Sequence, residues 1–188
     1  MVGYGAAVIL VVAATARELE FVVGAETLVC GIGPVESALA TAGALQGSLP
    51  TALLHIGIAG AQTLEPPALV LGSEAVYADV LDRNSVFPRV DRIGPDPALL
   101  AMVRALLPDA HVLPIATSGC VGGGTVCAVE AMEGFGVLRA AAHAGVPALE
   151  IRAVSNAVGE PDRKRWQIDA ALAALASSVT RLIEELRA

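Results

Sequence analysis

The sequence predicts a protein of the α/β class, with a buried sheet flanked by helices. Hydrophobic residues make up 55% of the 188 residues, and they are mainly Ala, Val and Leu, while aromatic residues reach only 3%. This composition suits a buried sheet covered by closely packed, alanine-rich helices. The length allows a sizeable core, and no linker-like stretch divides residues 1–188, so we expect one domain.

Apolar stretches separated by turn signals predict the elements in order. Ala7–Ala13 is rich in Val and Ile and predicts a strand, and Thr27–Cys30 predicts a second one that enters the tight turn 31–34. Val35–Leu45 then has helical spacing, and Pro34 suits the first turn of that helix. The later elements follow from the same signals: strands Ala52–Ile56, Val70–Tyr77, Ala110–Ala116 and Ala148–Val154, and helices Asp96–Leu107, Met132–Ala144 and Asp169–Leu186. Leu81–Pro97 is predicted as a surface excursion and Ser118–Thr125 as a glycine-rich loop.

The net charge bears on the class of ligand, and the cysteines bear on disulfides, metal sites and location. A formal net charge of -7 favours a small-molecule ligand over nucleic acid or an anionic membrane, which both need clustered Lys and Arg. Cys30, Cys120 and Cys127 form no CxxC pair, so we expect neither a disulfide framework nor a zinc site, and a cytoplasmic location fits. The apolar run 5–16 is shorter than the ~20 residues that span a bilayer. It predicts a buried strand, with a signal peptide as the alternative.

Polar residues collect at predicted strand ends and beside glycine turns, where open α/β sheets place their chemistry. These candidates are Glu18, Glu133, Arg152 with Asn156, and the glycine motifs 31–33 and 57–60. The first motif lacks the third glycine of a dinucleotide fingerprint because Glu36 stands there, so no NAD site is expected. The histidines share no spacing, and structural positions are expected for His55, His111 and His143.

The order and local sequence of these groups resemble a family of nucleosidases. The chain is similar to the nucleosidases of the nucleoside phosphorylase superfamily that cleave methylthioadenosine and S-adenosylhomocysteine, and more closely to the futalosine hydrolases of menaquinone biosynthesis. The similar segments are 14–18 (ATARE), 31–35 (GIGPV), 57–60 (GIAG), 130–136 (EAMEGFG) and 150–156 (EIRAVSN). The resemblance implies a three-layer α/β/α sandwich with a mixed, twisted central sheet. It also implies a homo-oligomer, dimer or larger, that hydrolyses the N-glycosidic bond of futalosine to release hypoxanthine without a metal or cofactor.

The resemblance implies a role in the reaction for each of two carboxylates, Glu18 and Glu133. Glu18 lies where the family places the general base that deprotonates the attacking water, and a solvated turn residue is the structural alternative. Glu133 matches the glutamate that accepts hydrogen bonds from ribose hydroxyls, and Met132 matches the residue that packs against the sugar. The structural alternative for Glu133 is an interaction with a helix N-terminus.

Asn156 stands where the adenine-releasing nucleosidases carry Asp. An amide offers both a donor and an acceptor, which suits a 6-oxopurine and implies hypoxanthine as the base. Gly57, Ile58 and Gly60 resemble the futalosine hydrolases more than the adenine-specific enzymes, and small residues there let a ligand approach the backbone. Arg152 is expected to orient Glu133 or Asn156, or to pair with a neighbouring carboxylate. The structural alternative for Asn156 is a turn-former after its strand.

The chain departs from the family between Thr117 and Val129, where a short glycine-rich stretch replaces a longer segment with a helix. Two alternatives to futalosine hydrolysis therefore stay open: another purine nucleosidase, acting on methylthioadenosine, S-adenosylhomocysteine or inosine, and a purine-nucleoside-binding protein without turnover. The basic run 163–165 is expected to be solvated, and Trp166 is expected to pack the last helix on the sheet, although the futalosine hydrolases have a similar Arg-and-Trp segment. The sequence identifies no residue for the benzoate portion of futalosine.

Overall fold

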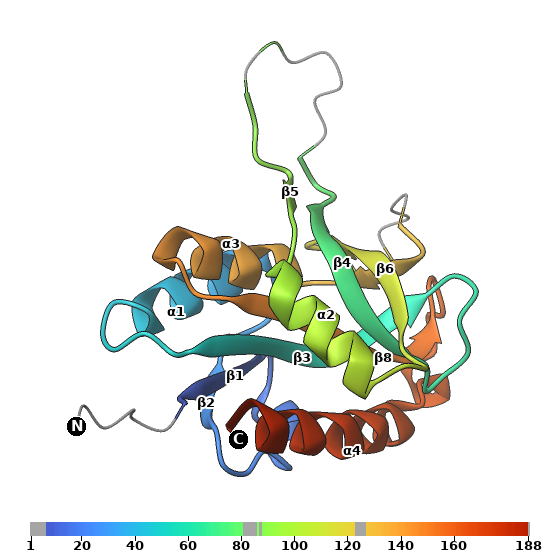
Figure 1. Cartoon of the computed structure of the whole chain (residues 1–188). Coiled ribbons are helices and arrows are strands. Elements are labelled where there is room, and N and C mark those ends of the chain that lie inside the picture. The colour runs from blue at the N-terminus through green and yellow to red at the C-terminus, as the bar shows by residue number, and fades with distance from the viewer. Residues whose placement is uncertain (1–6, 81–85, 87, 123–126, 188) are drawn as a thin grey trace, which may run out of the picture.

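A mixed sheet forms the centre of the computed structural model, which describes residues 7–80, 86, 88–122 and 127–187 (Figure 1). Its strands are β1 (Ile9–Ala13), β2 (Glu26–Val29), β3 (Ala52–Ala61), β4 (Leu69–Tyr77), β5 (Arg92–Ile93), β6 (His111–Thr117), β7 (Val129–Ala131) and β8 (Ala148–Ala157). β3 pairs in parallel with β1 and β8, and antiparallel with β7. The sheet therefore mixes both strand directions, as the family resemblance implies.

Five of these strands close on themselves. β3 pairs with β8, β8 with β4, β4 with β6, β6 with β7, and β7 returns to β3. Such closure gives each of these strands a partner on both sides over part of its length. β1 and β2 extend the sheet from the outer side of β3. The sequence analysis does not predict this ring.

Helices cover both faces of the sheet and make the predicted α/β/α layers (Figure 1). They are α1 (Pro34–Ala44), α2 (Pro97–Leu106), α3 (Gly134–Ala144) and α4 (Ile168–Arg187), with short 3-10 helices η1 (Ala16–Leu19) and η2 (Arg163–Arg165). α1 and α3 pack together on one face, while α2 and α4 share the core on the other. Gly136 permits the close approach of α1 and α3, since a Cβ there would lie 2.6 Å from the Pro34 carbonyl oxygen.

The period-2 alternation of the strands decides which side chains face which helices. Leu54 and Ile56 of β3 belong to the core beneath α2 and α4, whereas Leu53 belongs to the core beneath α1 and α3. His55 and Gly57 therefore lie on the α1 and α3 side. β8 alternates in the same way, since Leu149, Ile151 and Ala153 join the first core, which puts Glu150 and Arg152 on the α1 and α3 side.

Most element bounds agree with the predicted ones to within a few residues, and the main differences lie around the strand ends. β3 runs on through 57–60, and β8 runs on through Ser155 and Asn156, so both predicted end motifs are inside strands. β5 and β7 are additional, because strands of two and three residues carry no measurable periodicity. β5 takes up part of the predicted excursion, of which residues 81–85 and 87 lie outside the described part of the chain.

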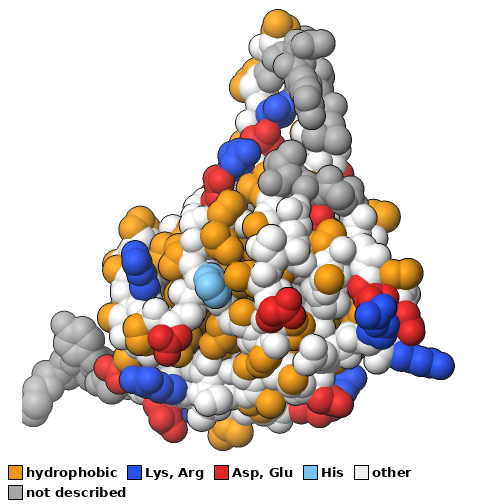
Figure 2. All heavy atoms as spheres, turned by 90° about the vertical axis from the view of Figure 1, so that its right-hand side faces the viewer, with side chains coloured by type: hydrophobic (Ala, Val, Ile, Leu, Met, Phe, Trp, Pro, Cys, Tyr) orange, Lys and Arg blue, Asp and Glu red, His pale blue; other side chains and the backbone are white. Residues whose placement is uncertain are grey.

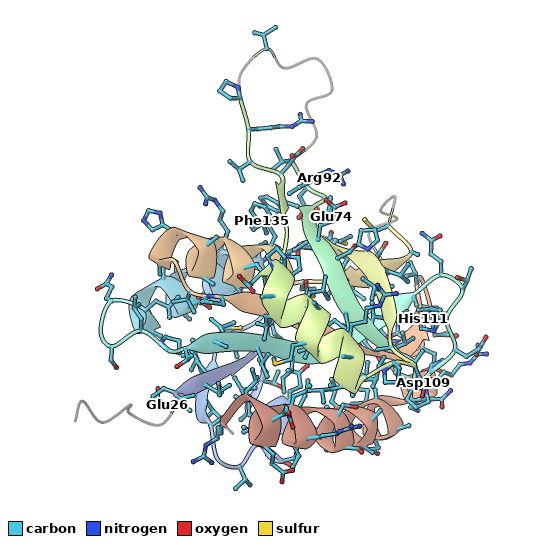
Figure 3. The ribbon with its side chains drawn as sticks, in the orientation of Figure 1. Glu26, Glu74, Arg92, Asp109, His111 and Phe135 are labelled. Atoms are coloured by element: carbon cyan, nitrogen blue, oxygen red, sulfur yellow. The ribbon has the colours of Figure 1, made fainter. Side chains whose placement is uncertain are left out.

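An ion pair in the C-terminal half of β4 joins this strand to β5. Arg92 Nη1 lies 2.6 Å from Glu74 Oε1, and Figure 3 shows the two side chains meeting beside the two strands. On the face shown in Figure 2 the acidic and basic side chains are scattered among apolar ones, with no single basic patch. No helix in the described residues is long and apolar enough to cross a membrane.

Candidate active site

A cavity of about 740 Å³ opens at the carboxyl ends of β1, β3 and β8. This is where parallel strands deliver side chains to a ligand in open α/β sheets. Seven of the eight residues that the sequence analysis selects line it: Glu18, Ile58, Gly60, Met132, Glu133, Arg152 and Asn156. Gly57, the eighth, lies behind the wall.

Glu18 is buried at the end of η1, with 7% of its surface exposed. Its Oε2 accepts hydrogen bonds from the Thr15 backbone N–H at 3.0 Å and from the Thr15 hydroxyl at 2.8 Å. Its Oε1 accepts from the Ile58 N–H at 3.2 Å, which ties η1 to β3. The side chain is therefore held in place, and its alternative as a solvated turn residue is wrong.

Arg152 lies between two buried carboxylates and is itself only 1% exposed. Its Nε donates to Glu150 Oε1 at 2.8 Å, and its Nη2 donates to Glu133 Oε2 at 3.2 Å. Burial alone would lower the pKa of Arg152, but Glu150 and Glu133 outweigh it and hold that pKa above its ordinary value. Burial raises the pKa of Glu150 more than Arg152 lowers it. No described residue bonds its Oε2. Arg152 thus orients Glu133, one of its predicted roles, and contacts a structural carboxylate as well.

His55 completes this network, although the sequence analysis gives it only a structural position. Its Nδ1 lies 3.1 Å from the Val12 carbonyl oxygen, and its Nε2 faces Arg152 Nη2. A carbonyl only accepts and a guanidinium only donates, so the ring is neutral with the proton on Nδ1. Burial, and then the charge of Arg152, lower the pKa of His55 well below its ordinary value. No sequence motif marks this residue, because its partners come from β1 and β8.

Glu133 sits between β7 and α3, at the N-cap position of the helix, but its side chain makes no cap hydrogen bond. Its Oε1 accepts instead from the Gly33 N–H at 3.2 Å, and its backbone carbonyl accepts from the Ser37 hydroxyl at 3.2 Å. Gly33 has a φ of +97°, which favours glycine and brings its N–H toward this carboxylate. The predicted tight turn before α1 therefore helps to orient Glu133. Because Gly33 is the N-cap residue of α1, the carboxylate also contacts a helix N-terminus, which is the structural alternative for Glu133.

Asn156 reaches the cavity through an irregularity in β8. The register between β3 and β8 shifts after Ala59, so that Gly60 faces Asn156 and Ser155 is the extra residue. Bulges of this kind redirect side chains and are frequent beside active sites. Asn156 Nδ2 donates to the Ala157 carbonyl at 2.9 Å, and its Oδ1 accepts from the Ser155 hydroxyl at 2.7 Å. The alternative as a turn-former after the strand is wrong, since Asn156 lies within the strand.

Gly57 gives space to protein side chains. It pairs with Arg152 in the register of β3 and β8. A Cβ at this position would overlap Arg152 Nη1 and lie 2.9 Å from Glu18 Oε1. The expected approach of a ligand to the backbone is therefore not the reason for this glycine, because Arg152 and Glu18 already occupy the space.

The described start of the glycine-rich loop also lines the cavity, with Cys120, Val121 and Gly122. Asp79 holds this start in place, because it accepts from the Ser118 hydroxyl at 3.0 Å and from the Gly119 N–H at 2.6 Å. Residues 123–126, which include the rest of the predicted loop, lie outside the described part of the chain.

The segment after β8 supplies further lining residues that sequence reasoning missed, among them Arg163 and Trp166. Trp166 was expected to pack the last helix on the sheet, but it lines the cavity and is half-buried. The similar Arg-and-Trp segment in the futalosine hydrolases was the signal for it. His111, in contrast, is exposed at the start of β6 beside Asp109 (Figure 3), and His143 is exposed on α3.

Known proteins resemble the chain over most of its length. The model of the phosphorylase superfamily matches residues 27–126. A futalosine hydrolase of Streptomyces coelicolor is 35% identical over 85% of this chain and 78% of its own, and one of Thermus thermophilus is 31% identical over 82% and 79%. The chain belongs to the futalosine hydrolase family. Within the phosphorylase superfamily, this family assignment agrees with the resemblance that the sequence motifs indicate.

Solved structures show the same fold at low sequence identity. A methylthioadenosine/S-adenosylhomocysteine nucleosidase of Colwellia psychrerythraea, in complex with adenine, has a TM-score of 0.83 at 18% identity and covers 98% of this chain and 97% of its own. A mutant futalosine hydrolase of Helicobacter pylori has a TM-score of 0.79 at 18% identity, covering 95% and 97%. The family fold therefore extends across nearly the whole chain.

Proposed function

We propose that the chain hydrolyses the N-glycosidic bond of futalosine and releases hypoxanthine. The observation that carries the proposal is the convergence of Glu18, Glu133 and Asn156 on one cavity, in a chain of the futalosine hydrolase family. Each of the three matches a different part of a purine nucleoside reaction: the water, the sugar and the base.

Glu18 is the general base in this proposal. As the bond from the ribosyl carbon to the purine nitrogen breaks, its electron pair leaves with the base, and water attacks the carbon while giving a proton to Glu18. A positioned carboxylate of this kind contributes about 10²- to 10⁴-fold to a rate. The contacts with Thr15 and Ile58 support the role, because they fix the carboxylate while leaving one lone pair of Oε1 for the water. Its negative charge in this region also disfavours phosphate as the nucleophile.

Glu133 holds the ribose. Its two oxygens each accept one hydrogen bond from the protein, from Gly33 and from Arg152. An ionised carboxylate has about four lone-pair sites, so acceptor capacity is left for the two hydroxyls of the sugar. Met132, next to it at the cavity wall, packs against the ribose ring.

Asn156 holds the leaving base. Its amide uses one N–H with Ala157 and one lone pair with Ser155. One N–H and one lone pair stay available. The N–H matches O6 of hypoxanthine, and the lone pair matches the N7–H of the base after the departing purine anion has taken a proton from solvent, because an amide cannot supply one. Ile58 and Gly60 line the same cavity on β3 and complete the wall beside the base.

The charges around Arg152 favour an oxocarbenium-like transition state. One guanidinium interacts with three carboxylates, those of Glu150, Glu133 and Glu18. The excess of negative charge lies in a largely buried setting, where preorganised charges have their greatest effect. Positive charge that builds on the ribosyl carbon is therefore stabilised.

Chromatography of purified protein incubated without phosphate tests the proposal. Futalosine, inosine and methylthioadenosine are supplied separately, and hypoxanthine from futalosine is expected. Release of adenine alone, or of no base at all, would contradict it.

The Glu18→Gln variant tests the assignment of the base. Its amide cannot take a proton from water, so kcat is expected to fall by about 10²-fold or more, while the circular dichroism spectrum stays unchanged. Full activity of this variant would overturn the role of Glu18 and leave the overall reaction standing.

A further inference from the structure

The cavity continues past the three groups of the proposed reaction, along the segment that follows β8. Val158, Pro161, Arg163 and Trp166 line it from this segment, together with Ile168 and Leu172 of α4. Apart from Arg163, these side chains are apolar or aromatic, so this part of the cavity suits a ligand group with a flat apolar body.

Among the described residues that line this region, Arg163 is the cation that makes no ion pair. Three arginines line the cavity. Arg17 pairs with Asp169, and Arg152 pairs with Glu150 and Glu133. Among the described residues, no carboxylate lies within ion-pair distance of Arg163, whose guanidinium carbon lies 5.1 Å from the centre of the Trp166 ring. A guanidinium over an aromatic face keeps its N–H groups available in the ring plane for a carboxylate.

The acidic residue beside Arg163 is already neutralised. Glu160 lines the same part of the cavity, but its Oε2 lies 3.0 Å from Arg165 Nη1, and its Oε1 accepts from the Asp162 N–H at 3.0 Å. Glu160 therefore pairs with Arg165 and not with Arg163, whose guanidinium stays available to an anionic group.

Hydrogen bonds hold the segment in position. The indole Nε1 of Trp166 donates to the Glu160 carbonyl at 3.2 Å, and the Asp162 side chain accepts from the Lys164 N–H at 3.0 Å. Beyond the indole, Gln167 N donates to the Ser155 carbonyl at 2.7 Å, next to Asn156. The segment is thus anchored to the strand that carries the proposed base-binding residue, which lowers the cost of ordering it around a ligand.

We propose that Arg163 and Trp166 form a subsite for an aryl carboxylate carried on the sugar side of the nucleoside. Trp166 and the neighbouring apolar side chains contact the ring, and Arg163 binds the carboxylate. The inference rests on the proposed function, because the benzoate portion of futalosine is the group of this chemistry.

Steady-state kinetics of Arg163→Gln with two substrates test the subsite. Losing a hydrogen bond to a charged group raises the KM for futalosine by about tenfold, with kcat nearly unchanged, whereas kcat/KM for inosine, which lacks the benzoate, stays as in the wild type. Lys164→Gln is the matched control, since Lys164 carries the same charge on the same short helix but does not line the cavity. An equal KM for futalosine in Arg163→Gln and wild type, or an equal rise in Lys164→Gln, would overturn the subsite.

Fluorescence gives a readout that does not depend on turnover. Trp166 is the one tryptophan of the chain, so its emission reports on the proposed subsite directly. A titration with 3-acetylbenzoate is expected to change the emission saturably in the wild type, with at least tenfold weaker binding in Arg163→Gln; the neutral methyl ester should bind both proteins equally. If the wild type leaves futalosine intact but binds the benzoate through Arg163, the proposed function fails and the subsite stands. No change with benzoate, or equal binding by both proteins, refutes the subsite.

Discussion

At the scale of single residues, His55 shows how a buried side chain takes a fixed protonation state from its partners. Val12 accepts its Nδ1 proton, and Arg152 excludes a proton from Nε2. The neutral ring is therefore part of the network that orients Glu133. The cost of protonating it should appear in the pH dependence of stability.

We predict that His55 makes the protein less stable as the pH falls below about 6.5. The pKa of His55 is lowered in the folded state, so below that pH the unfolded chain binds a proton that the folded chain does not. The free energy of unfolding then falls by about 1.4 kcal/mol per pH unit, until the folded pKa is reached. Urea titrations between pH 7.5 and 5.5 measure this slope, which should be lost in His55→Asn.

The comparison with His55→Asn isolates this residue. Glu150 has a raised pKa, so its contribution has the opposite sign: it is present at low pH and lost as the pH rises through the folded pKa. It stays in both proteins, and its effect cancels in the difference between them to first order. Parallel slopes for wild type and variant would show that His55 does not carry the effect.

Asn156→Asp is predicted to change the preferred base. A carboxylic acid can protonate N7 of adenine, which an amide cannot, but it offers a poorer match to hypoxanthine at neutral pH. We expect the ratio of kcat/KM for futalosine to that for methylthioadenosine to fall by about 10²-fold. Asn156→Ala serves as the control and should lose activity toward both substrates. An unchanged ratio in Asn156→Asp would remove Asn156 from the determinants of specificity.

At the scale of elements, the pairing of β3 with β8 positions the charged network. At Gly57 this pairing leaves no room for a Cβ, because Arg152 of β8 occupies the space. Parallel register puts Gly57 beside Arg152 and His55 beside Glu150. The bulge at Ser155 then brings Asn156 opposite Gly60. β3 and β8 thus supply side chains both to the cavity and to the network around Arg152. A methyl group added between these two strands should disturb the cavity and the network together.

Two glycine-to-alanine substitutions are predicted to have opposite effects. Gly57→Ala puts a Cβ into Arg152 and close to Glu18, and overpacking of this kind costs about 1–3 kcal/mol. Gly43→Ala lies in α1 with nothing within 4 Å of the added Cβ, and should stabilise by about 0.5–1 kcal/mol. Chemical denaturation of both variants, with hydrolysis assays alongside, checks the pair. Equal stability changes in the two variants would contradict the packing argument.

At the scale of the whole molecule, the cavity is lined by segments that lie far apart in the chain, from Ala14 after β1 to Leu172 in α4. Ligand binding should therefore stabilise the fold as a unit. Ile32 lines the cavity and is 62% exposed. Two apolar residues of α1 are also exposed, Val35 at 62% and Leu39 at 66%. The expected homo-oligomer stays a prediction, which sedimentation velocity would test.

Hypoxanthine is predicted to raise the melting temperature more than adenine does. At a hundredfold excess over Kd, a ligand adds about 2.7 kcal/mol to the stability, which for a chain of this size corresponds to a shift of about 5–10 °C. Differential scanning fluorimetry at matched concentrations gives the comparison, and Asn156→Ala should remove the preference. A larger shift with adenine would argue against a 6-oxopurine as the leaving group.

The sequence by itself determined the α/β class, the order of the main elements and seven of the lining residues. These follow from local signals, namely apolar periodicity, glycine turns and short motifs that resemble a family. Only the tertiary structure decided what depends on contacts between distant segments: the closed ring of strands, the role of His55, the reason for Gly57, and the place of Arg163 and Trp166 at the cavity. The physical reason is that a hydrogen bond between β1 and β3, or a clash between β3 and β8, leaves no periodic trace in either segment, because each partner alone is an ordinary residue of a buried strand.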